Sequence, residues 1–529
     1  MADQAKDATP IADKLSSFAH DEHVDDDAPK FEALDISYDN NGIKGILNSP
    51  FVFGAALLAS FGGFSFGYDQ GVISLILVMP QFTDQFPEVA SSSPHSGFNK
   101  GLLTGILELG AFIGCIAFPC LADRISRKWA ISIATGFFCV GAIMQTASQT
   151  YDTLVAEIAP PNLRGSLMVL ESVSIVIGAI VAYWITYGTR AINGDWAFRL
   201  PFLLQMIPAL TVGCGIHFFP FSPRWLALRD RNEESLESLA RLRRLPATDE
   251  TVQVEWKGII AEDRFQKEIL IQEHPDTGPI MMEVKQWLDL FRSKYLKRTI
   301  VATAIPFFQQ FSGINAFVYY APTFFSSLGQ TYNKSLILSG MINICQLIGN
   351  IPILLYFDQI GRRRIAIFGA FLMAIPHLIM AGIYRKFSSS WQTHQGVGWF
   401  GVALIYVYVL AYALSYGPLG WVLPAEVFPS SKRAKGVGLA VAVNWLANFI
   451  IGVVVPQMLE SIGWGTFLFF GLFCVAAGIF SFLFVPETAN RSLEQIAAIF
   501  GDDLNAEEDG LRLRIQMEVW AETNTQHQV

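Results

Sequence analysis

Charged residues are scarce in this sequence. Only 16% of the 529 residues are Asp, Glu, Lys or Arg, while 52% are apolar, and the formal net charge is −9. Such a composition is typical of proteins embedded in a membrane. An acidic balance also argues against nucleic-acid binding, which requires a basic surface. The sequence therefore predicts a membrane protein whose surroundings are the lipid bilayer.

Cysteines are few as well, and none is arranged for chemistry. All six lie inside apolar runs without the spacing of metal ligands: Cys115, Cys120, Cys139, Cys214, Cys345 and Cys474. We expect them to be small core residues and not a disulfide framework. The sequence also lacks a nucleophile–base pair, a metal-binding cluster and a phosphate-binding loop. These absences argue against an enzyme and against a bound cofactor or metal.

Apolar runs dominate what is present. A bilayer-crossing helix needs about 20 apolar residues. Backbone polar groups cannot stay unpaired in lipid, and runs this long and continuous do not suit barrel strands, so an all-α membrane protein is predicted. Eleven runs qualify, at approximately 51–79, 101–121, 129–148, 166–188, 199–220, 300–322, 335–357, 365–384, 398–424, 436–458 and 465–485.

Composition divides the chain into five parts. A polar tail (1–50) precedes a membrane half (51–220), a charged insert (221–298), a second membrane half (299–485) and a final tail (486–529). The insert has helical periodicity and is rich in Lys and Arg, which the positive-inside rule places in the cytoplasm. The first apolar run begins too late for a cleavable signal peptide, so the first tail is expected to be a disordered cytoplasmic arm.

One loop signature occurs twice, as Asp123–Lys128 and as Asp358–Arg364. Each copy is followed by an acidic residue, a turn and a basic residue before glycine, in Glu157–Gly165 and in Glu426–Gly436. Two apolar runs lie between these signatures in the second half, but only one lies between them in the first. We therefore predict two homologous halves in a twelve-span architecture from which the fourth span is missing.

The basic loop clusters support a missing span. In the second half they alternate with loops that hold few basic residues, as successive crossings require. In the first half the alternation holds only if one more helix lies between Ala156 and Glu157. The alternative is a natural eleven-span protein with a re-entrant or slanted segment at 149–165, although Thr150–Ala156 is too short to cross.

The loop signatures supply four acid–base pairs. Such pairs can cap helix ends and hold one face of a bundle closed. The alternative is that the basic residues only fix the topology, and the two roles are compatible. The pairs are Asp123 with Arg127, Glu157 with Arg164, Asp358 with Arg362–Arg364, and Glu426 with Arg433.

Amide side chains gather in the apolar runs of the second half. Amides both donate and accept hydrogen bonds, which suits the hydroxyls of a neutral polyol, and an aromatic ring offers a flat surface to its C–H groups. Amides can also simply hold helices together, but amides on four helices favour a polar cavity. The candidate substrate-binding residues are Gln309, Gln310, Asn315, Gln346, Trp421, Asn444 and Asn448.

Asp69 lies inside the first apolar run. A carboxyl group within a membrane marks a proton pathway or an ion pair with a neighbouring helix. The basic residues of the first half stand at the ends of its runs, so Asp69 is the candidate proton-coupling residue. Glu108 and Glu171 also lie in apolar runs and compete for this role.

The ordered set of motifs resembles the sugar porter family of the major facilitator superfamily, in its fungal sugar:proton symporter branch. Each motif alone is weak, but the ordered set is specific and covers nearly all of 50–500. The motifs are Gly67-Tyr68-Asp69, Asp123–Lys128, Glu157–Gly165, Ser222-Pro223-Arg224, Gln309–Asn315, Gly361-Arg362-Arg363, Pro424–Pro429 and Pro486–Glu494.

This resemblance implies two pseudo-symmetric helical bundles that open a central site to either side in turn. It implies a monomeric plasma-membrane transporter of a monosaccharide or related sugar, with a proton as second partner and the insert and both tails in the cytoplasm. Asp69 matches the proton-coupling aspartate of symporters. Sugar-contacting positions are matched by Gln309, Gln310, Asn315, Gln346, Trp421 and Asn444, and Asn448 lines the same cavity.

Three departures from the family pattern keep alternatives open. The fourth helix is absent, and with it the arginine that usually partners the aspartate matched by Asp69. Ser172 stands where the fifth helix often carries a sugar-binding Gln. Ser126 and Phe221 replace a Gly and a Glu of the loop motifs. The alternatives are a facilitative sugar uniporter, and a non-transporting sugar sensor or relic.

Overall fold

A computed structural model describes residues 50–151, 168–429, 431–489, 491, 493–500 and 504–526. Within these residues the regular structure is entirely helical. Eight of the described helices are long and apolar enough to cross a membrane. Each of the eleven predicted apolar runs contains a described helix or a pair of consecutive helices.

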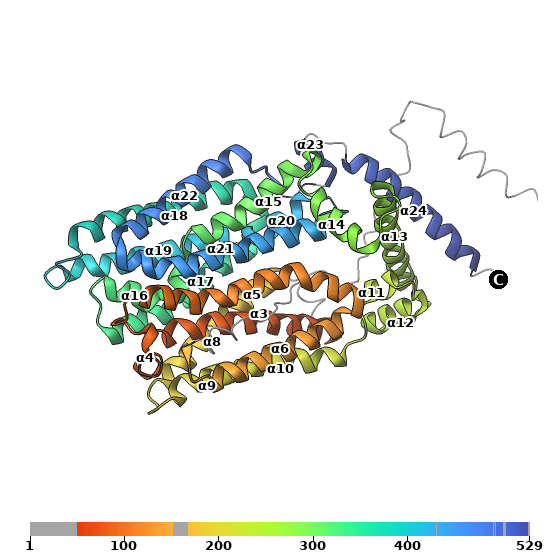
Figure 1. Cartoon of the computed structure of the whole chain (residues 1–529). Helices are drawn as coiled ribbons and strands as arrows, with labels where there is room; N and C mark the ends of the chain where they lie inside the picture. The colour runs from red at the N-terminus through yellow and green to blue at the C-terminus, as the bar shows by residue number, and fades with distance from the viewer. Residues whose placement is uncertain are drawn as a thin grey trace, which may run out of the picture. The chain divides into compact units, whose positions relative to one another are not determined.

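The first half consists of long helices joined by short ones (Figure 1). α3 (Pro50–Ile76), α5 (Ser96–Ile125), α6 (Arg127–Ala147) and α8 (Met168–Thr189) are continuous, whereas α9 (Trp196–Leu204) and α10 (Met206–Gly215) follow each other in one run. The short elements are α4 (Pro80–Gln85), η1 (Pro87–Val89) and η2 (Ile216–Phe218).

The insert and the final tail form helices that pack together. The insert contains α11 (Pro223–Leu228), α12 (Asn232–Arg243), α13 (Glu250–Glu273) and α14 (Pro279–Asp289), and the tail contains α23 (Leu493–Phe500) and α24 (Leu504–Gln526). Ile515 and Val519 of α24 pack against Phe265 of α13 in a small buried cluster. Figure 1 shows α11–α14 and α24 at one end of the bundle. We call that end, where Phe219 enters the insert, the insert face.

The second half has two spans that break in the middle. Its helices are α15 (Ser293–Phe311), α16 (Ile314–Ser327), α17 (Tyr332–Ile360), α18 (Arg362–Phe387), α19 (Gln395–Ala413), α20 (Tyr416–Val427), α21 (Arg433–Ser461) and α22 (Trp464–Phe484). Between α15 and α16, Gly313 has φ +96°, and a Cβ atom there would meet the Phe470 ring at 2.8 Å. At this break, Nε2 of the buried His377 forms a hydrogen bond of 3.0 Å with the carbonyl oxygen of Ser312. Irregular backbone is tolerated in a membrane when its polar groups are satisfied in this way.

Glycine contacts fix the directions of the helices. A Cβ atom at Gly67 would lie 1.8 Å from the Ile175 carbonyl oxygen, and one at Gly71 would lie 2.4 Å from the Ala179 carbonyl oxygen. The residue numbers of the two contacts increase along both helices, so α3 and α8 are parallel. α5 instead runs antiparallel to α21 of the second half, because Gly97 lies against Gln457 and Gly101 against Val453. Such small residues let helix backbones approach closely.

The chain on either side of 152–167 lies on opposite faces of the bundle. α6 ends away from the insert face, where the Gln85 amide donates to the Gln149 carbonyl (3.3 Å) and the Tyr151 hydroxyl to the Asn99 carbonyl (2.7 Å). α8 begins at the insert face, because it is parallel to α3, whose Gly54 lies against Phe219. The predicted site of the missing span, between Ala156 and Glu157, lies outside the described residues.

Candidate functional site

A polar cavity with about 700 Å³ of empty space lies between the two halves. The first half contributes Phe66 and Gln70 from α3 and an apolar wall from α8. The second half contributes most of the polar groups. All seven candidate substrate-binding residues line this cavity: Gln309, Gln310, Asn315, Gln346, Trp421, Asn444 and Asn448.

The amides of the second half form one hydrogen-bonded chain. Nδ2 of Asn315 donates to Oε1 of Gln310 (2.8 Å), and Nε2 of Gln310 donates to Oδ1 of Asn444 (3.0 Å). Nδ2 of Asn444 then donates to Oε1 of Gln309 (2.7 Å), and Nε2 of Gln309 bonds to the Tyr412 hydroxyl and to two carbonyls of α20. Each amide has further donors or acceptors. The chain therefore holds the amides in fixed directions while leaving polar capacity for a ligand.

Backbone shape places the first amide of this chain. Gly420 of α20 lies directly behind Gln309, and a Cβ atom at Gly420 would lie 2.5 Å from its Oε1. Only glycine leaves room for the side chain in its present position. Trp421 follows on the same helix and is half-buried in the cavity wall. The break before α20 thus brings an amide support and an aromatic surface to one place.

The cavity also contains polar residues beyond the seven candidates. Gln70, Asn343, Asn350 and Tyr412 all line it. Asn350 follows Asn343 by seven residues, which places both on one helix face, so a periodic signal was present. Gln70 stands beside Asp69 in the sequence and carried no such signal.

Asp69 faces a second cavity, with about 620 Å³ of empty space. Gln70 lines both cavities and so connects them, and Thr104, Gln145 and Gln205 add polar groups to the second. Oδ1 of Asp69 is buried and has no hydrogen-bond partner among the described residues. No Lys or Arg is among the described residues that line this cavity. Among the described residues, the wall of this cavity therefore offers Asp69 no basic side chain as an ion-pair partner.

The second-half loop signature forms a linked set of charges at the insert face. Arg362 contacts Asp358 at 2.7 Å and Glu426 at 2.7 Å. Glu426 also accepts a hydrogen bond from Thr488 (2.6 Å), and the Arg362 backbone N–H donates to Glu487 (2.7 Å). Three helix ends and the start of the tail are thus joined through one arginine.

Glu426 does not meet its expected partner. Among the described residues no hydrogen bond or ion pair joins Glu426 to Arg433. Arg433 begins α21, and the charges that act on it are those of Arg512 and Glu262. The two expected pairs of the first half cannot be placed, because the side chain of Asp123 and the whole of Glu157 and Arg164 lie outside the described residues. Arg127 is exposed.

The duplicated loops share one unusual backbone conformation. Gly361 has φ +93° and ψ +143°, and Ser126, at the matching place in the first signature, has φ +95° and ψ +142°. This region is essentially restricted to glycine and costs other residues about 1–3 kcal/mol. The Ser126 hydroxyl compensates in part by accepting a hydrogen bond from the Lys128 N–H (3.2 Å). The first signature therefore keeps the shape of the second at the cost of strain.

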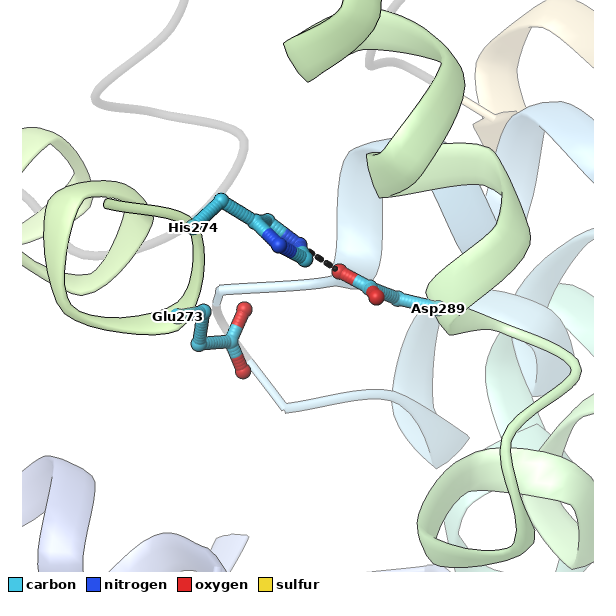
Figure 2. A group of neighbouring side chains, drawn as sticks. All are labelled: Glu273, His274 and Asp289. Carbon is cyan, nitrogen blue, oxygen red and sulfur yellow. Dashed lines mark hydrogen bonds and ion pairs between the residues drawn. The ribbon is translucent and has the colours of Figure 1, made fainter. Parts of the chain in front are cut away.

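A cluster of possible metal ligands lies where the insert meets the second half. Figure 2 shows the His274 ring turned towards Asp289, with Glu273 beside them, and Nε2 of His274 lies 2.7 Å from Oδ2 of Asp289. The ammonium group of Lys432 contacts both carboxylates, at 2.9 Å from Asp289. A positive charge already occupies the position between the acids, so the group is an ion-pair cluster that ties the insert to the loop before α21.

Electrostatics at Asp289 agree with this assignment. Burial acts to raise the pKa of the Asp289 carboxyl, but hydrogen bonds from Lys432 and His274 outweigh it and hold that pKa below its ordinary value. Asp289 is therefore ionised at neutral pH, paired with the buried Lys432.

Comparisons with known proteins match most of the chain. The family described as "Sugar (and other) transporter" matches residues 55–155 and 147–500. A high-affinity glucose transporter of Kluyveromyces lactis is 30% identical over 513 residues, covering 89% of each chain. An H(+)/hexose cotransporter of Parachlorella kessleri is 28% identical over 488 residues, covering 85% of this chain and 86% of its own. The solved structure of the proton:xylose symporter XylE is similar in fold, with a TM-score of 0.66, 23% identity, and coverage of 85% of this chain and 99% of that one.

Proposed function

The chain belongs to the sugar transporter family of the major facilitator superfamily, and from that premise we propose that it carries a monosaccharide across the membrane by alternating access, together with protons. One observation carries the proposal: all seven candidate residues line a single cavity whose walls come from both halves. A site shared in this way becomes accessible from either side when the halves rock against each other.

A neutral sugar suits the chemistry of this cavity. Its polar lining consists of amides and a tyrosine hydroxyl, and no Asp, Glu, Lys or Arg is among the described residues that line it. Amides can donate to and accept from sugar hydroxyls, while Trp421 offers a flat surface to sugar C–H groups. The relatives are glucose and hexose transporters, so D-glucose is the first substrate to test.

Proton coupling is proposed for Asp69. Its carboxyl group is buried, no basic residue is among the described residues of the adjoining cavity wall, and Gln70 next to it reaches the sugar cavity. A proton taken up there would change the polarity of the contact between the halves. The insert-face charges around Arg362 would hold one conformation closed, with the insert and tails in the cytoplasm and the protein in the plasma membrane.

A second candidate is a protein that binds sugar but does not transport it. It is favoured by the positions of Tyr151 and Met168, which lie on opposite faces with only the sixteen residues 152–167 between them. A helix that crosses the bilayer needs about 20 residues. The sugar cavity itself does not distinguish the two candidates.

Uptake and binding must therefore be measured separately. Cells lacking hexose uptake would express the chain, and accumulation of labelled D-glucose would be followed with and without an uncoupler. Binding would be followed by tryptophan fluorescence of the purified protein. Asp69→Asn is compared with Asp84→Asn, which changes an exposed aspartate.

Three outcomes are distinguishable. Accumulation that stops with the uncoupler and in Asp69→Asn, but continues in Asp84→Asn, supports symport. Uptake that only equilibrates and ignores the uncoupler replaces symport with a uniporter. Binding of D-glucose without uptake supports the second candidate and refutes transport.

A further inference from the structure

A buried carboxyl group joins the two halves at the boundary between the two cavities. Glu108 of α5 is fully buried, and its Oε1 accepts a hydrogen bond of 2.5 Å from the hydroxyl of Tyr319 in α16. Glu108 belongs to the first half and Tyr319 to the second. This contact is therefore made or broken when the halves move relative to each other.

The Tyr319 oxygen has no unused capacity. It accepts from Nε2 of Gln70 (3.0 Å) and from Nδ2 of Asn448 (3.1 Å), which occupy both of its lone pairs. Its single hydrogen must then go to Glu108, because neither N–H group can accept it. Glu108 accordingly acts as an acceptor in this structure.

Three of these four residues, Gln70, Tyr319 and Asn448, line one or both of the two cavities. Tyr319 and Gln70 line the cavity beside Asp69, while Gln70 and Asn448 line the sugar cavity. Among the described residues, the titratable groups that interact with Glu108 include Asp69 from α3 and Tyr319 from α16, and α21 contributes the neutral amide of Asn448. Two hydrogen bonds, from Tyr319 to Glu108 and from Asn448 to Tyr319, thus separate a charge change at Glu108 from the sugar cavity.

We propose that Glu108 is a second proton-carrying carboxyl group of the transport cycle, and that Tyr319 passes its protonation state to the sugar cavity. This inference rests on the proposed function of proton-coupled sugar transport. Glu171, the other rival in the sequence, has a side chain outside the described residues.

Protonation of Glu108 rearranges the hydrogen bonds around the Tyr319 hydroxyl. A proton from the Asp69 cavity binds Oε1 of Glu108, and the neutral carboxylic acid then donates to the Tyr319 oxygen. Because both lone pairs of that oxygen are occupied, one amide N–H must leave. Oδ1 of Asn448 has no hydrogen-bond partner among the described residues, so it can accept the hydrogen of Tyr319 while its Nδ2 turns to the sugar cavity. Protonation thereby frees one donor for a sugar hydroxyl.

The test is the pH dependence of sugar affinity in the full-length purified protein, read by tryptophan fluorescence with D-glucose and D-xylose as probes. One additional hydrogen bond corresponds to about a 2- to 12-fold gain in affinity. We expect the wild-type protein to bind more tightly by this factor at low pH than at high pH. Glu108→Gln, which can donate to Tyr319 at any pH, should bind tightly throughout and lose the pH dependence.

Tyr319→Phe should also lose the pH dependence, because the hydroxyl that links Glu108 to Asn448 is gone. The matched control is Tyr320→Phe on the same helix, whose buried hydroxyl donates to the Gly452 carbonyl (2.6 Å) outside this group. The control should keep the wild-type pH profile. A single symmetrical peak in size-exclusion chromatography identifies variants that fold.

Either of two results overturns the inference. One is a wild-type affinity that does not change with pH, and the other is a wild-type pH profile in Glu108→Gln or Tyr319→Phe. Transport is judged separately: if Asp69→Asn still accumulates D-glucose, the role proposed for Asp69 fails while the pH profile of binding still decides the role of Glu108. If neither sugar binds at any pH, both proposals fall.

Discussion

Replacing Lys432 by Met tests whether the ion-pair cluster fastens the insert to the second half. The ammonium group is almost fully buried, as its side chain is 2% exposed, and it contacts Glu273 and Asp289, of which the second is 1% exposed. Methionine keeps much of the side-chain length but removes the charge. Asp289 would then remain buried beside Glu273, hydrogen-bonded to His274 and paired only with the exposed Arg292.

The structure also provides a matched control for the size of the effect. Lys435 pairs with Glu283, with side chains 16% and 33% exposed, and each lysine lies over an aromatic ring, at 5.7 Å from Tyr295 for Lys432 and 5.4 Å from Trp287 for Lys435. The cation–π contribution is therefore similar in the two variants. Breaking a buried pair from one side costs about 3–5 kcal/mol, whereas a surface pair contributes about 1 kcal/mol or less, and the partly buried Lys435 pair lies nearer the second case.

Thermal unfolding of the detergent-solubilised protein, followed by tryptophan fluorescence, compares the two variants. We expect the loss of thermal stability in Lys432→Met to be at least threefold that in Lys435→Met, in line with those two costs. Adding Glu273→Gln and Asp289→Asn to Lys432→Met should recover much of the loss, because no buried carboxylate is then left without the lysine, and Arg292 is exposed to water. Equal losses in the two single variants, or no recovery in the triple variant, would refute the view that the buried charges hold this junction.

The other predictions concern single positions. Gly420→Ala should weaken D-glucose binding about 2- to 12-fold without lowering thermal stability by much, because the new methyl displaces Gln309; isothermal titration measures it, and unchanged affinity would count against a role of Gln309 in binding. Ser126→Gly should raise thermal stability by up to about 2 kcal/mol, since it relieves φ +95° and loses only one weak cap; a lower melting temperature would contradict the strain. The pKa of Asp289 is lowered in the folded protein from its ordinary value of 3.8, so the ionised carboxylate stabilises the fold at pH values above 3.8. This contribution is lost as pH falls through the lowered pKa. The stability difference between wild type and Asp289→Asn should therefore close below about pH 4.

The sequence predicted the helices because crossing a bilayer imposes a length and an apolar content that can be counted. The sites of the breaks are harder to predict. Gly313 and Ser415 interrupt their spans because tertiary partners satisfy the freed backbone groups, as His377 does for Ser312. Those partners lie more than sixty residues away in the chain. Local pattern therefore shows the span but not where it bends.

Some residues of the candidate site could likewise be predicted from the sequence, and others could not. Amides in apolar runs were visible because burying them in lipid is costly, and the structure places all seven candidates at one cavity. Gln70 was not visible as a site residue, because its role comes from Tyr319, which is 249 positions away. The partner of Glu426 was assigned from sequence proximity, yet Arg362 reaches it across helices. The packing of α24 on α13 was not predicted from the sequence.

The strongest remaining prediction concerns the segment between Tyr151 and Met168. The family matches the chain in two stretches, 55–155 and 147–500, that overlap, as expected when an internal part of the family pattern has no counterpart here. The described chain leaves one face at Tyr151 and resumes at the other at Met168. We therefore expect a transcript that encodes about 20 further apolar residues at the Ala156–Glu157 junction, which would restore alternating topology through the insert. Sequencing the message across the junction measures this directly. A transcript that reads as the present chain would make the eleven-span protein real, and sugar binding without transport would then become the leading function until uptake is demonstrated.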